Sequence, residues 1–224
     1  MLGPYKQLCK TPSDINEHLP ILYKYGMECR SILELGVRGC VSSWAFLNAR
    51  PDLLILNDIQ PCDVIHLQEV AKREKLRVET IWGNDLEITV PEVDLVFIDT
   101  YHVYGQLKRE LAKFGKLARG YIIMHDTEVD GVMGECLRNG WDPRRMAQIT
   151  GIPFEEHLKG LQPAIDEFLA EHPYWILHEV FKNNNGLTVL KRISKHEAVF
   201  RQTRTAASEV VSPPPSSLSH EQPE

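Results

Sequence analysis

A carboxylate and an imidazole follow one of the most hydrophobic segments of the chain. Asp99 comes directly after residues 94–98, and His102 stands three positions further on. Both groups are costly to bury without a partner, so neither is expected to serve packing. An imidazole titrates near neutral pH, which suits His102 to removing the proton of a hydroxyl group, with Asp99 beside it. A histidine here could equally cap or hydrogen-bond its own loop.

A second polar turn follows the next hydrophobic segment. His125 and Asp126 come directly after residues 121–124. If both segments are parallel strands of one sheet, their carboxyl ends meet at the same edge, and Asp99 and Asp126 face one cleft. Two carboxylates in one cleft suit Mg²⁺ or another divalent cation. Whether the protein needs a metal stays open at this point.

The turn after residues 31–35 is suited to binding a nucleoside. Gly36 would let the backbone pass close to a ligand, and the helix that follows would present free N–H groups. Asp58 lies 22 residues after Gly36 and could accept hydrogen bonds from both hydroxyls of a ribose. The alternatives are a plain strand-to-helix turn and an exposed loop acid.

Two further groups of residues belong to the candidate site. Asn84 and Asp85 follow the third hydrophobic run and could either meet the edge of a nucleobase or cap the next short helix. Tyr101, Tyr104 and Trp141 could form an aromatic wall for an acceptor, although aromatic residues at such spacings more often belong to the core. The role of both groups depends on where the fold places them.

Five short apolar runs must position these residues. They cover residues 31–35, 53–57, 77–81, 94–98 and 121–124. Each is rich in Ile, Leu and Val and too short for a helix, which is typical of a buried parallel strand. The stretches between the runs have helical periodicity, as in residues 104–117, where Leu107, Leu111 and Phe114 share one face. This alternation predicts an α/β domain with a mostly parallel sheet.

The C-terminal part of the chain predicts a hairpin. Residues 174–181 and 187–192 are strand-like, and the Asn-Asn-Asn-Gly segment at 183–186 that joins them tolerates positive φ. Residues from about 131 to 171 would then be an insertion before the hairpin that covers a substrate pocket. Five parallel strands and an antiparallel hairpin predict a seven-stranded, Rossmann-like sheet.

Residues 31–126 resemble the class I S-adenosylmethionine-dependent methyltransferases. Within this class, the chain resembles the branch of macrocin-type sugar O-methyltransferases and cephalosporin-hydroxylase-like proteins. That branch carries an E-x-G turn with a following Ser, a D-x-x-H-x-Y step after the fourth strand and an H-D pair after the fifth. The matching residues are Glu34, Gly36, Ser42, Asp99, His102, Tyr104, His125 and Asp126. An antiparallel seventh strand beside the fifth also belongs to this fold.

The resemblance implies a fold, a cofactor and an activity. The fold is a Rossmann-like class I methyltransferase domain in residues 1–194. S-adenosylmethionine would be bound by Glu34, Gly36, Ser42, Asp58, Asn84, Asp85 and Asp99. His102 and Asp99 would be catalytic, Tyr101, Tyr104, His125 and Asp126 would contact the substrate, and Asp99 and Asp126 would hold any divalent cation. The reaction would be O-methylation of a small molecule, with a sugar or glycan as first choice and a phenol or catechol as second.

The chain departs from these families at two positions. The last glycine of the E-x-G-x-x-x-G turn is Cys40, and Gly39 falls one position early. His125 stands where catechol-type sites have a hard oxygen ligand. An NAD-dependent oxidoreductase and a non-catalytic module with this fold therefore stay open as alternatives. The oxidoreductase would normally have a G-x-G-x-x-G turn and lack the terminal hairpin.

Composition indicates the partners and the compartment. The 224 residues carry a net charge of −6 and lack the basic stripe that duplex binding requires, so we expect no nucleic-acid partner. No run approaches the roughly 18 apolar residues of a membrane span, and five scattered cysteines favour reduced thiols. We expect a cytoplasmic protein that could form a homodimer and has no membrane partner. Residues 195–224, which end in a Pro- and Ser-rich stretch, predict a disordered tail.

Overall fold

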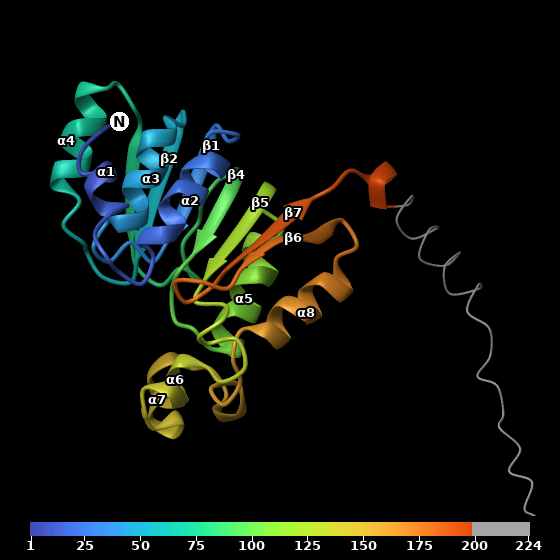
Figure 1. Ribbon diagram of the computed structural model, residues 1–224. Coiled ribbons are helices and arrows are strands. Elements are labelled where there is room, and N and C mark those ends of the chain that lie inside the picture. The colour runs from blue at the N-terminus through green and yellow to red at the C-terminus, as the bar shows by residue number, and fades with distance from the viewer. Residues whose placement is uncertain (199–224) are drawn as a thin grey trace, which may run out of the picture. The chain divides into compact units, whose positions relative to one another are not determined.

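The computed structural model describes residues 1–198, and in this part of the chain seven strands form one sheet (Figure 1). The strands are β1 (Ser31–Leu35), β2 (Leu53–Asp58), β3 (Val78–Trp82), β4 (Val93–Ile98), β5 (Ala118–His125), β6 (Trp175–Phe181) and β7 (Leu187–Arg192). Their order is β3-β2-β1-β4-β5-β7-β6, and β7 runs antiparallel to both of its neighbours while the other pairs are parallel. The predicted seven-stranded, mostly parallel sheet with a terminal antiparallel hairpin is therefore confirmed.

The predicted strand bounds differ most from the structure at β5. The hydrophobic run covers residues 121–124, whereas the strand begins at Ala118. The side chain of Arg119 forms an ion pair with Asp94 of β4, with 2.9 Å between Nη2 and Oδ1. Because this ion pair joins the two neighbouring strands, β5 can begin in a segment that is not apolar. A hydrophobicity pattern does not detect such a start.

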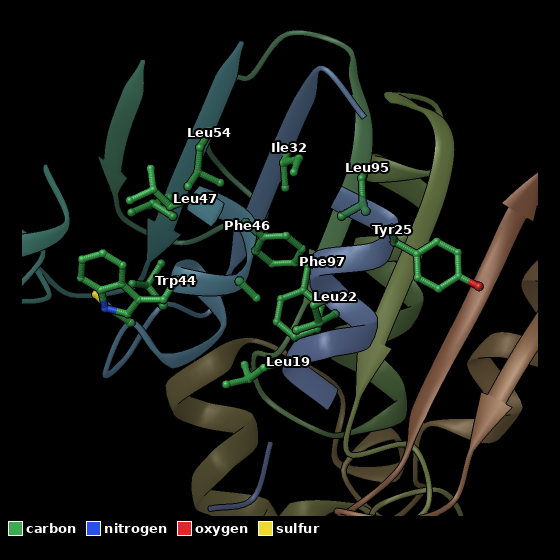
Figure 2. Packing of buried hydrophobic residues seen from close by; sticks show 14 of the residues in the cluster. Leu19, Leu22, Tyr25, Ile32, Trp44, Phe46, Leu47, Leu54, Leu95 and Phe97 are labelled. Atoms are coloured by element: carbon green, nitrogen blue, oxygen red, sulfur yellow. The ribbon is translucent and has the colours of Figure 1, made fainter. Parts of the chain in front are cut away.

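Helices cover both faces of the sheet. One face carries α1 (Tyr5–Leu8), α2 (Leu19–Gly26), α3 (Val41–Ala49) and α4 (Ile65–Arg73), with the short turn η1 (Asn16–His18) before α2. The other face carries α5 (Tyr104–Phe114) and α8 (Gln162–Glu171). Successive strand residues point to opposite faces, so Leu54 and Leu56 pack in the first layer and Ile55 in the second. Figure 2 shows side chains of α2 and α3 packed against those of β1, β2 and β4.

The segment between β5 and the hairpin divides into two parts. It contains α6 (Glu135–Arg138), α7 (Pro143–Thr150), the turn η2 (Phe154–Glu156) and α8. Figure 1 shows α6 and α7 beyond one end of the sheet, and α7 has no buried residue. In contrast, Ala164, Ile165 and Phe168 of α8 are buried in the same cluster as the apolar face of α5. The predicted insertion can therefore cover a site with α6 and α7, whereas α8 belongs to the helical layer.

Residues 1–192 form one compact unit. Among residues 1–198, no helix is both long and apolar enough to cross a membrane. All five cysteines are free thiols. The predicted boundary at residue 194 and the tail stay predictions, because residues 199–224 lie outside the described part of the chain.

Candidate functional site

A cavity of about 560 Å³ opens at the carboxyl ends of β1, β2, β3 and β4. Its volume is in the range of small-molecule sites. Residues of the N-terminal segment and of α7 also line it. Eight of the residues predicted from the sequence line this cavity: Gly36, Ser42, Asp58, Asn84, Asp85, Asp99, Tyr101 and His102.

Gly36 brings two backbone segments of the cavity wall into contact. Its φ is +88°, and a Cβ built on it would lie 2.6 Å from the carbonyl carbon of Asp99 and nearer still to the carbonyl oxygen. No other residue fits there, because both the space and the dihedral angle exclude a side chain. A Cβ on Gly39 would meet only Val41, at 4.0 Å. The glycine that this turn requires is therefore Gly36, and Gly39 is not a displaced substitute.

The loop after Gly36 holds Asp58 in place although residue 40, the last glycine of the E-x-G-x-x-x-G turn, is a cysteine here. Cys40 has a φ of +58° and Arg38 a φ of +43°, so two residues with side chains adopt the left-handed conformation. The backbone N–H of Arg38 donates to Asp58 Oδ2 at 2.9 Å. The loop and the acid at the end of β2 are thus joined directly, and the carboxylate of Asp58 lines the cavity.

Glu34 does not reach the cavity. Its side chain is fully buried, and the hydroxyl of Ser42 in α3 donates to its Oε1. Its Oε2 has no hydrogen-bond partner, and burial raises the pKa of Glu34 to about 8. The prediction that Glu34 contacts the cofactor is therefore not supported by its position. Residues alternate between the faces of a strand, and this one points under α3, where it contacts Ser42.

Asn84 and Asp85 both line the cavity, and Asn84 also caps the turn after β3. The side chain of Asn84 accepts a hydrogen bond from the N–H of Leu86 at 3.0 Å, which caps the turn, and it also lines the cavity. Asp85 is buried and accepts a hydrogen bond from Gln106 Nε2 at 3.1 Å. Burial and the nearby carboxylate of Asp85 raise the pKa of Glu110 well above its ordinary value. Gln106, which also lines the cavity, was not predicted from the sequence.

His102 lies among four carboxylates. Its Nε2 is 3.3 Å from Asp99 Oδ1, and its Nδ1 is 3.2 Å from Asp126 Oδ2. Carboxylate oxygens of Asp130 and Glu135 each lie 3.5 Å from Nδ1. Burial lowers the pKa of His102, but the hydrogen bonds and charges of its acidic neighbours outweigh burial and raise it to about 10. The predicted convergence of Asp99, His102 and Asp126 is present in the structure.

His125 is buried beside this cluster and does not line the cavity. Its Nδ1 lies 3.5 Å from both Asp99 Oδ1 and Asp126 Oδ1, and its Nε2 lies 3.2 Å from the carbonyl oxygen of Asn184. Asp126 has a φ of +57° and is likewise buried. Burial raises the pKa of Asp99, but the hydrogen bond from His102 and the nearby imidazole of His125 outweigh it and hold this pKa well below its usual value. His125 and Asp126 therefore do not face the cavity, and they can affect a ligand there only through their contacts with Asp99 and His102.

Three charged residues of this cluster were missed from the sequence, namely Asp130, Glu135 and Arg138. Asp130 is fully buried, and both of its carboxylate oxygens bind the guanidinium of Arg138 in α6, at 2.6 and 2.8 Å. The backbone N–H of Asp130 donates to the carbonyl of Asp126, so a single turn brings it beside His102. Asp130 follows no strand and Arg138 lies in the insertion, so an analysis of strand ends does not detect either residue.

The aromatic residues do not form the predicted wall. Tyr101 lines the cavity, and its hydroxyl lies 3.1 Å from His157 Nδ1. The ring of Trp141 is 6.2 Å from that of Tyr101 between centroids, but Trp141 does not line the cavity. Tyr104 points away from the site, and its hydroxyl donates to Glu167 of α8 at 2.8 Å. The wall formed by α7 is instead mainly apolar, since Met146 and Ile149 line the cavity together with Thr150.

No family model and no curated protein matches the sequence. Solved structures match the fold. The O-methyltransferase TomG from Streptomyces achromogenes, in complex with S-adenosylmethionine, superposes with a TM-score of 0.56 and 17% sequence identity over 82% of this chain and 82% of that chain. An O-methyltransferase from Bacillus cereus in complex with S-adenosylhomocysteine gives a TM-score of 0.53 and 18% identity over 79% of this chain and 80% of that chain. These similarities show that the chain has the class I methyltransferase fold.

Proposed function

We propose that this protein is an S-adenosylmethionine-dependent O-methyltransferase. One observation carries the proposal. A single cavity is lined both by Gly36 and Asp58, which suit a nucleoside, and by the acid and imidazole of Asp99 and His102. Methyl transfer to a hydroxyl group needs these two parts within reach of each other. The similarity of the fold to O-methyltransferases with bound cofactor or cofactor product supports the proposal.

The cavity wall fits the cofactor at three points. Gly36 presents only backbone atoms to the cavity, because any Cβ at this position would collide with Asp99. Asp58 is oriented by the N–H of Arg38, and its carboxylate oxygens can accept further bonds from ribose hydroxyls. The first turn of α3 has no side-chain cap and can receive a carboxylate. S-adenosylmethionine supplies an electrophilic methyl group when bound.

His102 is the proposed base for the acceptor hydroxyl. With a pKa of about 10, which Asp130, Asp99 and Asp126 raise, His102 keeps its proton at neutral pH. His102 can accept a proton only after another positive charge binds to Asp99 and Asp126 and so lowers the pKa of the imidazole. Both carboxylates lie within 4.8 Å of His125 Nδ1 in a set that could hold a divalent cation. Such a cation would bind the acceptor hydroxyl and lower its pKa.

A sugar or glycan hydroxyl is the proposed acceptor. The D-x-x-H-x-Y step supports this choice, and carboxylates of Asp14 and Glu135 line the cavity and can accept hydrogen bonds from hydroxyl groups. The apolar residues Met146 and Ile149 favour the second candidate, a phenol or catechol whose ring would pack against α7.

Thermal-shift measurements on the full chain test the proposal. A ligand that binds only the folded state raises the melting temperature, so S-adenosylhomocysteine should stabilise the protein and NAD should not. Asp58→Ala should reduce the shift. Asp52→Ala, which changes an exposed acid directly before the first residue of β2, should keep it. Stabilisation by NAD alone would instead favour an oxidoreductase. Transfer of labelled methyl groups to sugar and catechol acceptors then separates the two acceptor classes, and absence of transfer to either would favour a binding module.

A further inference from the structure

Three side chains at the ends of β4 and β5 form a set with unsatisfied polar atoms. One ligand atom each from Asp99, His125 and Asp126 lies within 4.8 Å of the other two. His125 is 1% exposed, and neither its Nδ1 nor Oδ1 of Asp126 has a hydrogen-bond partner. Buried polar atoms without partners are rare in folded proteins because each costs desolvation free energy. Their convergence on one point indicates a ligand that accepts electron pairs from both.

The imidazole of His125 is held with one particular nitrogen facing this point. Its Nε2 lies 3.2 Å from the carbonyl oxygen of Asn184, and because a carbonyl only accepts hydrogen bonds, Nε2 carries the proton. In the neutral ring the lone pair is then on Nδ1, which faces Asp99 and Asp126. A backbone carbonyl that fixes the tautomer of a histidine is the usual outer partner of a metal ligand.

The carbonyl of Asn184 is itself fixed by the N-terminal segment. Asn184 lies in the hairpin turn with a φ of +48°, and its side chain accepts from the N–H of Glu17 at 2.9 Å and donates to the carbonyl of Ser13 at 2.7 Å. The buried ring of His18 also lies with its Nε2 3.1 Å from this carbonyl. The orientation of His125 is therefore set by contacts from two distant parts of the chain.

The neighbouring set of His102, Asp126 and Asp130 could also hold a cation, and Nδ1 of His102 likewise has no hydrogen-bond partner, but this set already contacts a positive charge. Asp130 uses both carboxylate oxygens to bind Arg138, and His102 Nε2 is hydrogen-bonded to Asp99. A cation between His102 and Asp130 would lie close to the guanidinium of Arg138, and the two positive charges would repel each other. The ion-pair contacts of His125 with Asp99 and Asp126 include no guanidinium, so the position bounded by these three residues is the more favourable one for a cation.

We infer that this position is a transition-metal site in which Nδ1 of His125 is a ligand, and that it prefers Mn²⁺, Fe²⁺, Co²⁺ or Zn²⁺ over Mg²⁺ and Ca²⁺. Mg²⁺ and Ca²⁺ take oxygen ligands, whereas an imidazole nitrogen suits the divalent transition metals. The inference rests on the proposed function for the role of the ion, but its binding can be measured without any activity.

The test uses the full chain after removal of any bound metal. Calorimetric titration measures its affinity for Co²⁺, Zn²⁺, Mn²⁺ and Mg²⁺, each in a separate experiment. Co²⁺ and Zn²⁺ should bind about 100-fold or more tightly than Mg²⁺. His125→Asp should weaken Co²⁺ and Zn²⁺ binding about tenfold or more and strengthen Mg²⁺ binding, because it replaces nitrogen by oxygen. His66→Asp is the matched control at an exposed histidine and should leave both affinities unchanged. Equal affinity of the wild type for Mg²⁺ and Co²⁺ would overturn the inference.

A spectroscopic measurement on the wild type avoids any dependence on how the variant folds. Pulsed electron paramagnetic resonance of the Mn²⁺-bound protein should detect a directly coordinated nitrogen, since His125 supplies one. Bound Mn²⁺ without a nitrogen signal would show an all-oxygen site and refute the assignment of His125. Metal binding with a nitrogen ligand in a protein that fails to bind S-adenosylhomocysteine would refute the proposed function and leave this inference standing.

Discussion

Replacing Gly36 by alanine tests whether the turn after β1 is built around a close backbone contact. A residue with a side chain at a φ of +88° is strained by about 1–2 kcal/mol. The new Cβ would also lie 2.6 Å from the carbonyl carbon of Asp99, so the end of β4 must move. That movement would weaken the hydrogen bond from the N–H of Asp99 to the carbonyl of Leu35, now 2.9 Å, which contributes about 1 kcal/mol. The expected loss is roughly 2–4 kcal/mol of unfolding free energy.

Thermal and urea denaturation measure this loss directly. For a chain of this size the melting temperature should fall by roughly 5–15 °C. Gly39→Ala is the matched control, because its Cβ meets only Val41 at 4.0 Å, and its stability should stay within about 0.5 kcal/mol of wild type. Gly36→Ala should also weaken S-adenosylhomocysteine binding, since Asp99 lines the cavity. Equal melting temperatures for the two alanine variants would refute the reasoning.

Three other substitutions test single groups of the site. Burial raises the pKa of Glu34 from its ordinary 4.5 to about 8, so the folded state keeps a proton that the unfolded state releases, and stability should fall as the pH rises from about 4.5 to about 8. The stability of Glu34→Gln should fall less steeply with pH than that of the wild type, most clearly between about pH 4.5 and 6, below the range in which unfolded histidines release protons. A wild-type slope in the variant there would be evidence against the buried acid. Asp58→Ala should weaken S-adenosylhomocysteine about tenfold or more in calorimetry, and an unchanged affinity would remove Asp58 from the cofactor site. His102→Ala should lower methyl transfer about a hundredfold or more with cofactor affinity near wild type, and full turnover would exclude it as the base.

The fold was predictable because its signals are local. Hydrophobic runs of strand length, the helical periodicity between them and the Asn-Gly hairpin step each lie within a few residues of one another. The convergence of Asp99 and Asp126 followed from the same information, since β4 and β5 are parallel neighbours whose carboxyl ends share an edge. The strand-end rule thus predicted a cluster from residues 27 positions apart in sequence.

Side-chain direction and loop paths were not predictable in the same way. Glu34 is buried under α3, and Tyr104, the first residue of α5, reaches back to Glu167 of α8. Sequence spacing gives the position of such residues along an element, but packing between elements decides which way they point. Asp130 and Arg138 belong to irregular segments whose course depends on the contacts that they themselves form. No periodicity could have paired them.

The charges of the cluster suggest why residue 125 is a histidine. Four carboxylates, those of Asp99, Asp126, Asp130 and Glu135, surround His102, and the guanidinium of Arg138 balances one of them. Protonated imidazoles can balance two more when no metal is bound. His125→Asp would replace one of those imidazoles by a fifth carboxylate, which like-charge repulsion disfavours in a buried site. Without metal, this variant should have a lower melting temperature than the wild type. Addition of Mg²⁺ should raise the melting temperature of the variant more than that of the wild type. A variant that melts like the wild type in the presence of a chelator would show that His125 does not balance this charge.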